Sequence, residues 1–224
     1  MLTATEALKN RISIRQFLPT PLSGALVMDL LEAAREPGLE THHQPWKVIV
    51  VAGAEREAVT ALARRLFAAG APSEEGNDPI YPPDLWDPYR SRRYKLGMDL
   101  YAQLGIARND MAGRKAQMER NFDFFGAPIG LFFVIDRASG PEEWIRLGKF
   151  MLNLSLLAVD RGLGTCMQEY WATVRVSLHK HLSLAETDMV YCGMALGYPD
   201  PDAAANRLRS DRAPVEEFAA FRGF

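Results

Sequence analysis

Short apolar blocks alternate with amphipathic stretches along the chain, and this pattern predicts buried strands joined by helices. The β-rich blocks are expected to form strands at residues 46–51, 129–135, 165–170 and 189–196. Apolar residues at helical spacing predict helices between Ser23 and Pro37 and at residues 3–10, 54–69, 95–105, 108–120, 141–161 and 173–182.

Two of these elements are more apolar than a surface element needs to be. The strand at 46–51 is too apolar for a one-sided edge strand, so we expect it inside the sheet. The helix at 141–161 is apolar over a wide arc, which predicts a position in the centre of the fold or at a subunit contact.

Two further stretches interrupt the alternation. Prolines and aromatic residues are interleaved from Gly70 to Tyr94, which predicts an ordered excursion; with the two helices after it, it forms a cap or insertion at about residues 71–125. Residues 199–224 have little core pattern, so we expect an arm that lies on another surface, with a partner subunit as the natural candidate. Because no repeat or linker divides the chain, we predict a single α+β domain over residues 1–224.

Composition narrows the function classes. The 48% hydrophobic and 24% charged residues are typical of a soluble globular protein, and the absence of a membrane-spanning run or a signal-peptide pattern favours the cytoplasm. A net charge of −2 gives no general attraction to nucleic acid. Cys166 and Cys192 are expected to be reduced, buried thiols, and no cluster of ligands around the histidines indicates a metal.

A candidate anion site follows the first helix. Residues two apart in an extended segment point to the same side, so Arg11, Ser13 and Arg15 can converge on one phosphate while the intervening isoleucines anchor the segment. Guanidinium groups offer paired donors to phosphate oxygens and keep their charge. The alternative is a solvated basic edge.

The chain shows no signature of a catalytic triad and no glycine-rich nucleotide loop. If the protein is an enzyme, a cofactor is therefore expected to carry the reaction, with no catalytic side chain, and the anion site becomes the place for the cofactor's phosphate.

Five motifs along the chain resemble, in order, the landmarks of the FMN-dependent nitroreductase family. They are Arg11-Ile12-Ser13-Ile14-Arg15, Gln44-Pro45-Trp46, Arg161-Gly162-Leu163-Gly164-Thr165-Cys166, Gly193-Met194-Ala195-Leu196-Gly197-Tyr198-Pro199 and Arg212-Ala213-Pro214-Val215-Glu216-Glu217-Phe218. Each motif is weak alone, but together they cover essentially the whole chain.

The resemblance implies a nitroreductase-like α+β fold with a central mixed, mainly antiparallel sheet surrounded by helices. It also implies a homodimer with a domain-swapped C-terminal arm and two FMN molecules at the subunit interface. The residues equivalent to His42 and Gln44 then come from the partner subunit, and a turn around Thr165 lies near the flavin ring. The expected cofactor-binding residues are Arg11, Ile12, Ser13, Arg15, Leu39, His42, Gln44, Thr165, Cys166, Gln168, Glu169, Ser210 and Arg212.

The implied reaction passes hydride from NAD(P)H through flavin N5 to a small nitroaromatic or quinone acceptor, by a ping-pong mechanism in one shared pocket. Candidate stacking partners for the substrate are aromatic residues of the cap, although core or surface packing is the alternative for each: Tyr89, Tyr94, Tyr101, Phe122 and Phe124.

Two other functions remain open. One is a different flavin reaction on the same fold, namely reductive dehalogenation, ene reduction, dehydrogenation or flavin destruction; the other is a flavin-binding module without turnover. The chain departs from common family patterns at Gly38-Leu39, His42 and Met167, where relatives frequently have Pro-Ser, Asn and Pro. These departures affect the expected contacts with the flavin ring, not those with the flavin phosphate.

Overall fold

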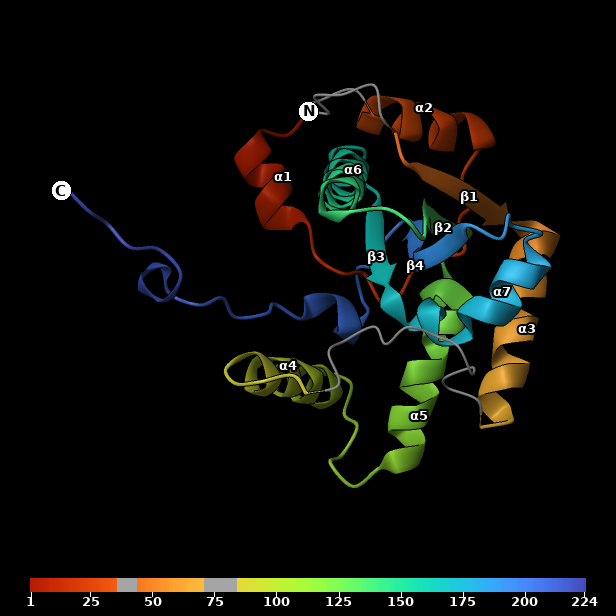
Figure 1. Cartoon of the computed structure of the whole chain (residues 1–224). Helices are drawn as coiled ribbons and strands as arrows, with labels where there is room; N and C mark the ends of the chain where they lie inside the picture. Colours follow the sequence, from red (N-terminus) through yellow and green to blue (C-terminus); the bar gives the residue numbers. More distant parts are fainter. Residues whose placement is uncertain (36–43, 71–83) are drawn as a thin grey trace.

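A four-stranded antiparallel sheet forms the centre of the molecule (Figure 1). The structure is a computed structural model that describes residues 1–35, 44–70 and 84–224. The strand order is β1-β2-β4-β3, and the strands are β1 (Trp46–Ala52), β2 (Ile129–Asp136), β3 (Gly164–Gln168) and β4 (Asp188–Gly197). The α+β class predicted from the sequence is confirmed, and an isolated bridge between Ser13 and Thr165 adds one parallel pairing to the antiparallel ones.

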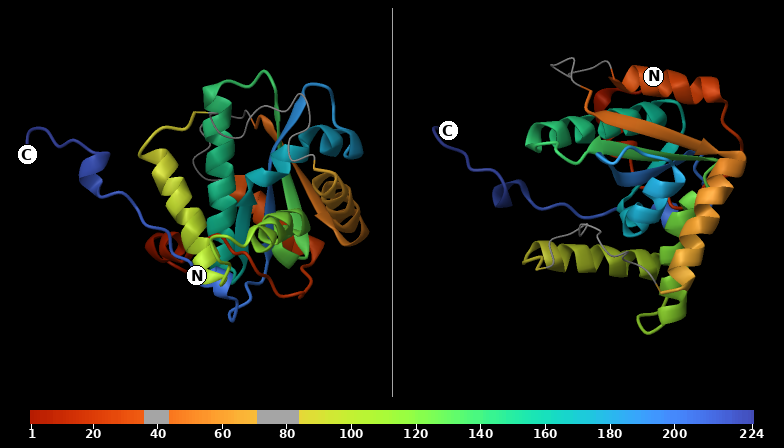
Figure 2. Two further views of the ribbon diagram at one scale, coloured as in Figure 1. Left: turned by 90° about the horizontal axis from the view of Figure 1, so that it is seen from below. Right: turned by 45° about the vertical axis from the view of Figure 1, so that its right-hand side comes forward.

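Helices cover both faces of the sheet (Figures 1 and 2). One side carries α1 (Ala4–Asn10), α2 (Gly24–Arg35) and α6 (Pro141–Asp160); the other carries α3 (Gly53–Ala68), α7 (Arg175–His181) and the 3-10 segments η1 (Arg120–Gly126) and η2 (Glu169–Val174). Each face of the sheet therefore has its own hydrophobic core. Helix α6 buries six residues on one face of the sheet, while Ile145 and Leu152 are exposed, so the subunit contact predicted as the alternative for this helix stays a prediction.

The edge position of β1 contradicts the expectation that this strand is interior. Its neighbour on one side is β2, and Val50 is 40% exposed. The apolar composition has another cause: Trp46 and Val48 pack against one core, while Ile49 and Val51 belong to the other. An edge strand covered by helices on both faces needs apolar residues on both.

The helices of the predicted cap lie outside the layers that cover the sheet, and the second of them packs against η1 and α3. Helix α4 (Tyr89–Gln103) begins six residues earlier than predicted, because Pro88 is the last proline of the excursion and nothing after it prevents helix formation. Helix α5 (Met111–Glu119) is capped at its N-terminus by Asp110, whose side chain accepts a hydrogen bond from the Gly113 N–H at 2.8 Å. Among the described helices, none combines the length and apolar character needed to cross a bilayer.

The C-terminal segment runs along the end of the domain and then leaves it (Figure 1). It contains the 3-10 turns η3 (Ala204–Arg207) and η4 (Val215–Glu217), and Ala205 is its buried anchor. Beyond η4 the chain extends into solvent with exposed phenylalanines at 218, 221 and 224.

A strained turn at η1 completes the core beneath β2. Phe124 and Phe125 both have φ near 54°, a left-handed conformation that phenylalanine rarely adopts. The ring of Phe124 stacks on Trp171 with a centroid separation of 4.8 Å and covers Gly130, where a Cβ atom would lie 2.3 Å from the ring. The close approach therefore requires glycine at position 130.

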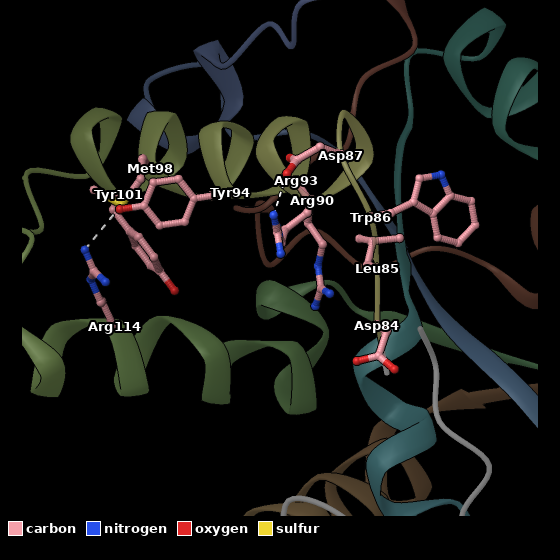
Figure 3. Close-up of a pocket in the computed structure, with 11 residues that line it drawn as sticks. Asp84, Leu85, Trp86, Asp87, Arg90, Arg93, Tyr94, Met98, Tyr101 and Arg114 are labelled. Carbon is pink, nitrogen blue, oxygen red and sulfur yellow. Dashed lines mark hydrogen bonds and ion pairs between the residues drawn. The ribbon is translucent and has the colours of Figure 1, made fainter. Parts of the chain in front are cut away.

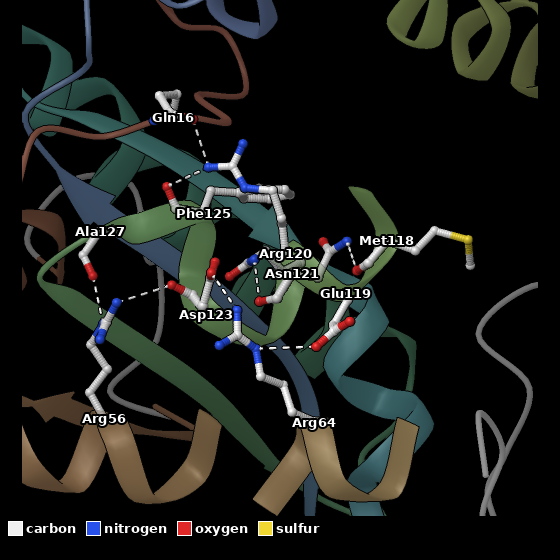
Figure 4. A network of polar contacts seen from close by, with 11 residues as sticks. Gln16, Arg56, Arg64, Met118, Glu119, Arg120, Asn121, Asp123, Phe125 and Ala127 are labelled. Carbon is white, nitrogen blue, oxygen red and sulfur yellow. Dashed lines mark hydrogen bonds and ion pairs between the residues drawn. The ribbon is translucent and has the colours of Figure 1, made fainter. Parts of the chain in front are cut away.

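Arginines of α3 hold the same turn (Figure 4). Arg56 donates through Nε to the Ala127 carbonyl at 2.7 Å and through a terminal nitrogen to the Asp123 carbonyl at 3.2 Å. Arg64 pairs with the Asp123 carboxylate at 2.8 Å and with Glu119 at 3.5 Å. These contacts fix the turn from the helix side while Phe124 fills the core.

Gly130→Ala is expected to destabilise the protein by about 1–3 kcal/mol, because its Cβ overlaps the Phe124 ring and forces the turn to move. Gly148→Ala in α6 is the matched control, since its Cβ meets nothing within 4 Å and a helical Gly→Ala change stabilises by about 0.5–1 kcal/mol. Urea titrations of both variants measure the difference, and equal midpoints would rule out the proposed overlap.

Candidate functional site

The chain leaves α1 in an extended stretch, which we call the clamp segment (residues 11–17). This segment lies against the start of β3: Ser13 forms a parallel bridge to Thr165, and the Ile14 N–H donates to the Thr165 carbonyl at 2.9 Å. Ile14 is buried, as the predicted anchoring role requires. Backbone pairing therefore fixes the direction of the side chains on either side of Ile14.

Asn206 of η3 fastens the clamp segment from the other side. Its carbonyl oxygen accepts the Arg15 N–H at 2.8 Å, and its amide nitrogen donates to the carbonyls of Gln16 at 2.8 Å and Asp200 at 2.9 Å. Arg120 of η1 also donates to the Gln16 side chain at 2.7 Å (Figure 4). One asparagine thus ties together two segments that are about 190 residues apart.

A small polar cavity opens where the clamp segment meets the C-terminal segment. Its volume is about 110 Å³, and we call it the arginine cavity. The residues that line it are Arg11, Ile12, Ser13, Arg15, Leu96, Leu208, Ser210 and Arg212. The structure therefore brings together residues that are far apart in the sequence and that were assigned to one site from the resemblance.

The charge in this cavity is uncompensated. Three guanidinium groups and two hydroxyl groups surround it, and none of the described lining residues is acidic. Arg212 donates to the Ser210 hydroxyl at 2.5 Å and to backbone carbonyls, and Arg15 donates weakly to the Ser13 carbonyl at 3.4 Å. Neutral acceptors leave the guanidinium charges available to an anion.

Helix α4 fixes the segment that carries Arg212. Lys95 contacts the carboxylates of Asp211 at 2.8 Å and Asp99 at 2.7 Å, and Arg92 pairs with Glu217. Hydrogen bonds to Asp211 and then Asp99 raise the pKa of Lys95, and Lys95 in turn lowers the pKa of Asp211. The residue adjacent to Arg212 is therefore held against the helix.

The predicted residues of β3 lie behind the clamp segment and are largely closed to solvent. Thr165, Cys166 and Gln168 are buried, whereas Met167 is 41% exposed. Burial raises the pKa of the Cys166 thiol to about 11, against the opposing effects of Arg15 and Ser13. Cys166 is thus a neutral thiol at physiological pH, not a nucleophile.

The remaining predicted contacts lie elsewhere. Glu169 starts η2 and is half-buried, and Gln44 is exposed just before β1. Leu39 and His42 lie outside the described residues, as does Gly38. Their predicted contacts with flavin stay predictions.

The aromatic candidates for substrate contact separate into two groups. Tyr94 and Tyr101 line a larger cavity between α4 and α5 (Figure 3), while Tyr89 is 51% exposed and packs edge-on against Trp86. Phe122 and Phe124 are fully buried in the core, so neither is open to a ligand in this structure. For these two, core packing, the alternative considered for each aromatic residue, is what the structure shows.

Two features of this region were missed in the sequence. Asn206 stands in a stretch without periodicity, where a short amide can bind backbone groups, but nothing in the sequence names its partners. Arg114 of α5 faces the α4–α5 cavity, but α5 is an ordinary polar helix, so the sequence does not distinguish Arg114 from a surface arginine. The described ranges contain no cluster of three or more potential metal ligands.

Comparison with known proteins places this geometry in context. Residues 8–198 match the nitroreductase family. A 4-nitrobenzoate reductase from Pseudomonas putida is 38% identical over 217 residues, covering 96% of this chain and 93% of the relative. A nitrobenzene nitroreductase from Ectopseudomonas oleovorans is 34% identical, covering 96% of this chain and 95% of the relative.

A solved structure agrees over the full length. The FMN- and NADPH-dependent nitroreductase NfnB from sphigopyxis sp. strain HMH is 37% identical and superposes with a TM-score of 0.92, covering 100% of both chains.

Proposed function

This chain belongs to the nitroreductase family of oxidoreductases, and we propose that it reduces nitroaromatic compounds with NAD(P)H, using FMN held at the arginine cavity. The observation that carries this proposal is the convergence of Arg11, Arg15 and Arg212 on one small cavity whose described lining includes no acidic residue. NADPH and FMN are the cofactors named for the similar solved enzyme.

The residues present fit the phosphate of FMN. A phosphate monoester carries nearly two negative charges and accepts several hydrogen bonds, and the cavity offers three guanidiniums together with the Ser13 and Ser210 hydroxyls. The cavity volume of about 110 Å³ suits a phosphate group rather than a whole nucleotide. The cofactor-binding roles of Ile12, Thr165 and the other predicted residues remain part of the proposal.

Bound FMN would supply hydride chemistry, accepting a hydride from NAD(P)H and passing it to the nitro acceptor. The protein's own residues bind and orient. Arg11, Arg15 and Arg212 fix the phosphate end through charge, and the pairing of Ser13 with Thr165 keeps the clamp segment rigid. With the Cys166 thiol neutral, we propose no side-chain nucleophile at this site.

The α4–α5 cavity is the proposed substrate pocket of a cap within a single domain. Arg93 and Leu85 line both this cavity and a second cavity beside α4. The second cavity shares Leu96 and Arg212 with the arginine cavity. If reductant and acceptor use this pocket in turn, the kinetics are ping-pong, with parallel lines in double-reciprocal plots.

We also propose a homodimer in which the C-terminal arm lies on the partner. Phe218, Phe221 and Phe224 are 72%, 70% and 104% exposed, and this much aromatic surface is costly in water. Leu39, His42 and Gln44 would then contribute to the partner's flavin site, as the family resemblance implies.

The function is tested by the visible spectrum of the purified protein. We expect the absorption of bound FMN, its loss on anaerobic addition of NADH or NADPH, and its return on addition of a nitroaromatic compound. A quinone and an α,β-unsaturated ketone test competing flavin reactions. A colourless protein that does not bind added FMN would sink the proposal, and a protein that binds FMN but resists NAD(P)H would be a flavin carrier instead.

Arg212→Ala is expected to raise the dissociation constant of FMN by roughly 10–100-fold, because it removes a charge-assisted phosphate contact. Arg209→Ala is the matched control on the same segment, since Arg209 donates to the Asn206 and Leu208 carbonyls and does not line the cavity. Flavin fluorescence titration measures both constants. Equal losses in the two variants would refute a specific role for Arg212.

Ending the chain after Ala213 keeps Arg212 and removes the exposed phenylalanines, so we expect a dimer to become a monomer at micromolar concentration. Replacing the three phenylalanines with serine keeps the chain length and should weaken the dimer in the same direction. Light scattering coupled to size-exclusion chromatography gives the masses. A full-length monomer, or a truncated dimer of undiminished stability, would contradict the proposed arm exchange.

A further inference from the structure

The cavity between α4 and α5 is large enough for a substituted aromatic ring. Its volume is about 690 Å³, within the range of small-molecule sites. Leu85, Trp86 and Met98 supply apolar surface, and Tyr94 and Tyr101 add aromatic rings from α4 (Figure 3). In an apolar cavity, the positions of the few polar groups determine which ligand binds.

Three arginines and two aspartates, Asp84 and Asp87, supply the charged groups of this cavity. Arg90 and Arg93 reach into it from α4, and Arg114 reaches across from α5 (Figure 3). Arg90 already has a carboxylate partner, since its guanidinium lies 2.5 Å from Asp87. The charge of Arg90 is therefore largely balanced within the protein.

Arg114 is in a different position. Among the described residues no carboxylate pairs with its guanidinium, which contacts the Met98 sulfur at 3.4 Å and lies 4.8 Å from the centroid of the Tyr101 ring. Its Nε is buried and has no hydrogen-bond partner among those residues. A guanidinium cannot shed its charge, so an anion in the cavity can pair with the terminal nitrogens of Arg114.

The position of Tyr101 adds a geometric constraint. It lies under the Arg114 guanidinium, which fixes the plane of the arginine by cation–π contact. A planar, oriented guanidinium suits a carboxylate, which accepts two parallel hydrogen bonds. The neighbouring tyrosine ring at position 94 lines the same space and can flank an aromatic ligand.

We propose that Arg114 selects aromatic carboxylates as acceptors, by binding the carboxylate while Tyr94 flanks the ring. This inference rests on the proposed function and narrows it from nitroaromatic compounds in general to those carrying an anionic group. The carboxylate is bound and not transformed, so the reduction takes place at the nitro group alone. The reductant NAD(P)H also carries anionic phosphate together with aromatic rings. Its phosphate is therefore the alternative ligand for Arg114.

The test compares Arg114→Met with Arg108→Met. Arg108 is an exposed arginine in the connection between α4 and α5 that does not line the cavity, so both variants lose one positive charge from the same region. Arg114→Lys is the conservative variant, which keeps charge but not the paired donors. Circular dichroism and thermal melting confirm that each holoenzyme is folded.

Binding is measured first with benzoate, which has no nitro group, so this readout does not require turnover. We expect Arg114→Met to weaken benzoate binding to the holoenzyme roughly tenfold or more, Arg114→Lys to restore part of the loss, and Arg108→Met to change it less than twofold. Unchanged benzoate affinity in Arg114→Met, or no benzoate binding by the parent enzyme, would overturn the proposal.

Steady-state kinetics then separate the two sources of the anion. For Arg114→Met we expect KM to rise roughly tenfold for 4-nitrobenzoate and to stay within twofold for nitrobenzene, NADH and NADPH. An effect on NADPH alone assigns Arg114 to the reductant's phosphate and overturns the acceptor assignment, as do equal effects on both acceptors. Failure to reduce either acceptor refutes the proposed function instead, while the benzoate measurement still decides the role of Arg114.

Discussion

The backbone contacts that hold the clamp segment are the constraint on which the site depends. Ile14 is bonded to Thr165 at the start of β3, and Asn206 holds Arg15 and Gln16 from the C-terminal segment. These contacts connect the beginning, middle and end of the chain at one corner of the sheet. Charged side chains on an unattached loop would be dispersed by their own repulsion, so the three arginines converge only because the backbone beneath them is fixed.

Helix α4 connects the two halves of the proposed site. The side of α4 that carries Lys95 and Leu96 meets the segment holding Arg212, and the side that carries Tyr94 and Tyr101 faces the α4–α5 cavity. A displacement of this helix therefore affects both the phosphate end and the substrate end. In this arrangement the proposed cap contributes Leu96 to a cavity that is otherwise lined by residues within 11–15 and 208–212.

Sequence reasoning reached the α+β fold and the shared orientation of alternate residues from 11 to 15 because both depend on local patterns, whereas Arg212 was assigned to the same cavity only through the family resemblance. Alternation in an extended segment predicts which of residues 11–15 share a side, and apolar blocks predict the strands. The same reasoning placed β1 in the interior, because it cannot distinguish a central strand from an edge strand with helices on both faces. It also offered Phe122 and Phe124 as substrate contacts, because aromatic composition alone does not separate a core from a pocket.

The arginines show what only the structure could add. Arg64 and Arg161 have carboxylate partners at 2.8 Å and 2.7 Å and act as structural ties. Arg108 is exposed and lines none of these cavities. Arg114 combines a cavity position with neutral neighbours, as do the arginines of the clamp. Residue type is identical in all these cases; what marks a binding role is a positive charge directed into a cavity that the protein itself leaves unbalanced.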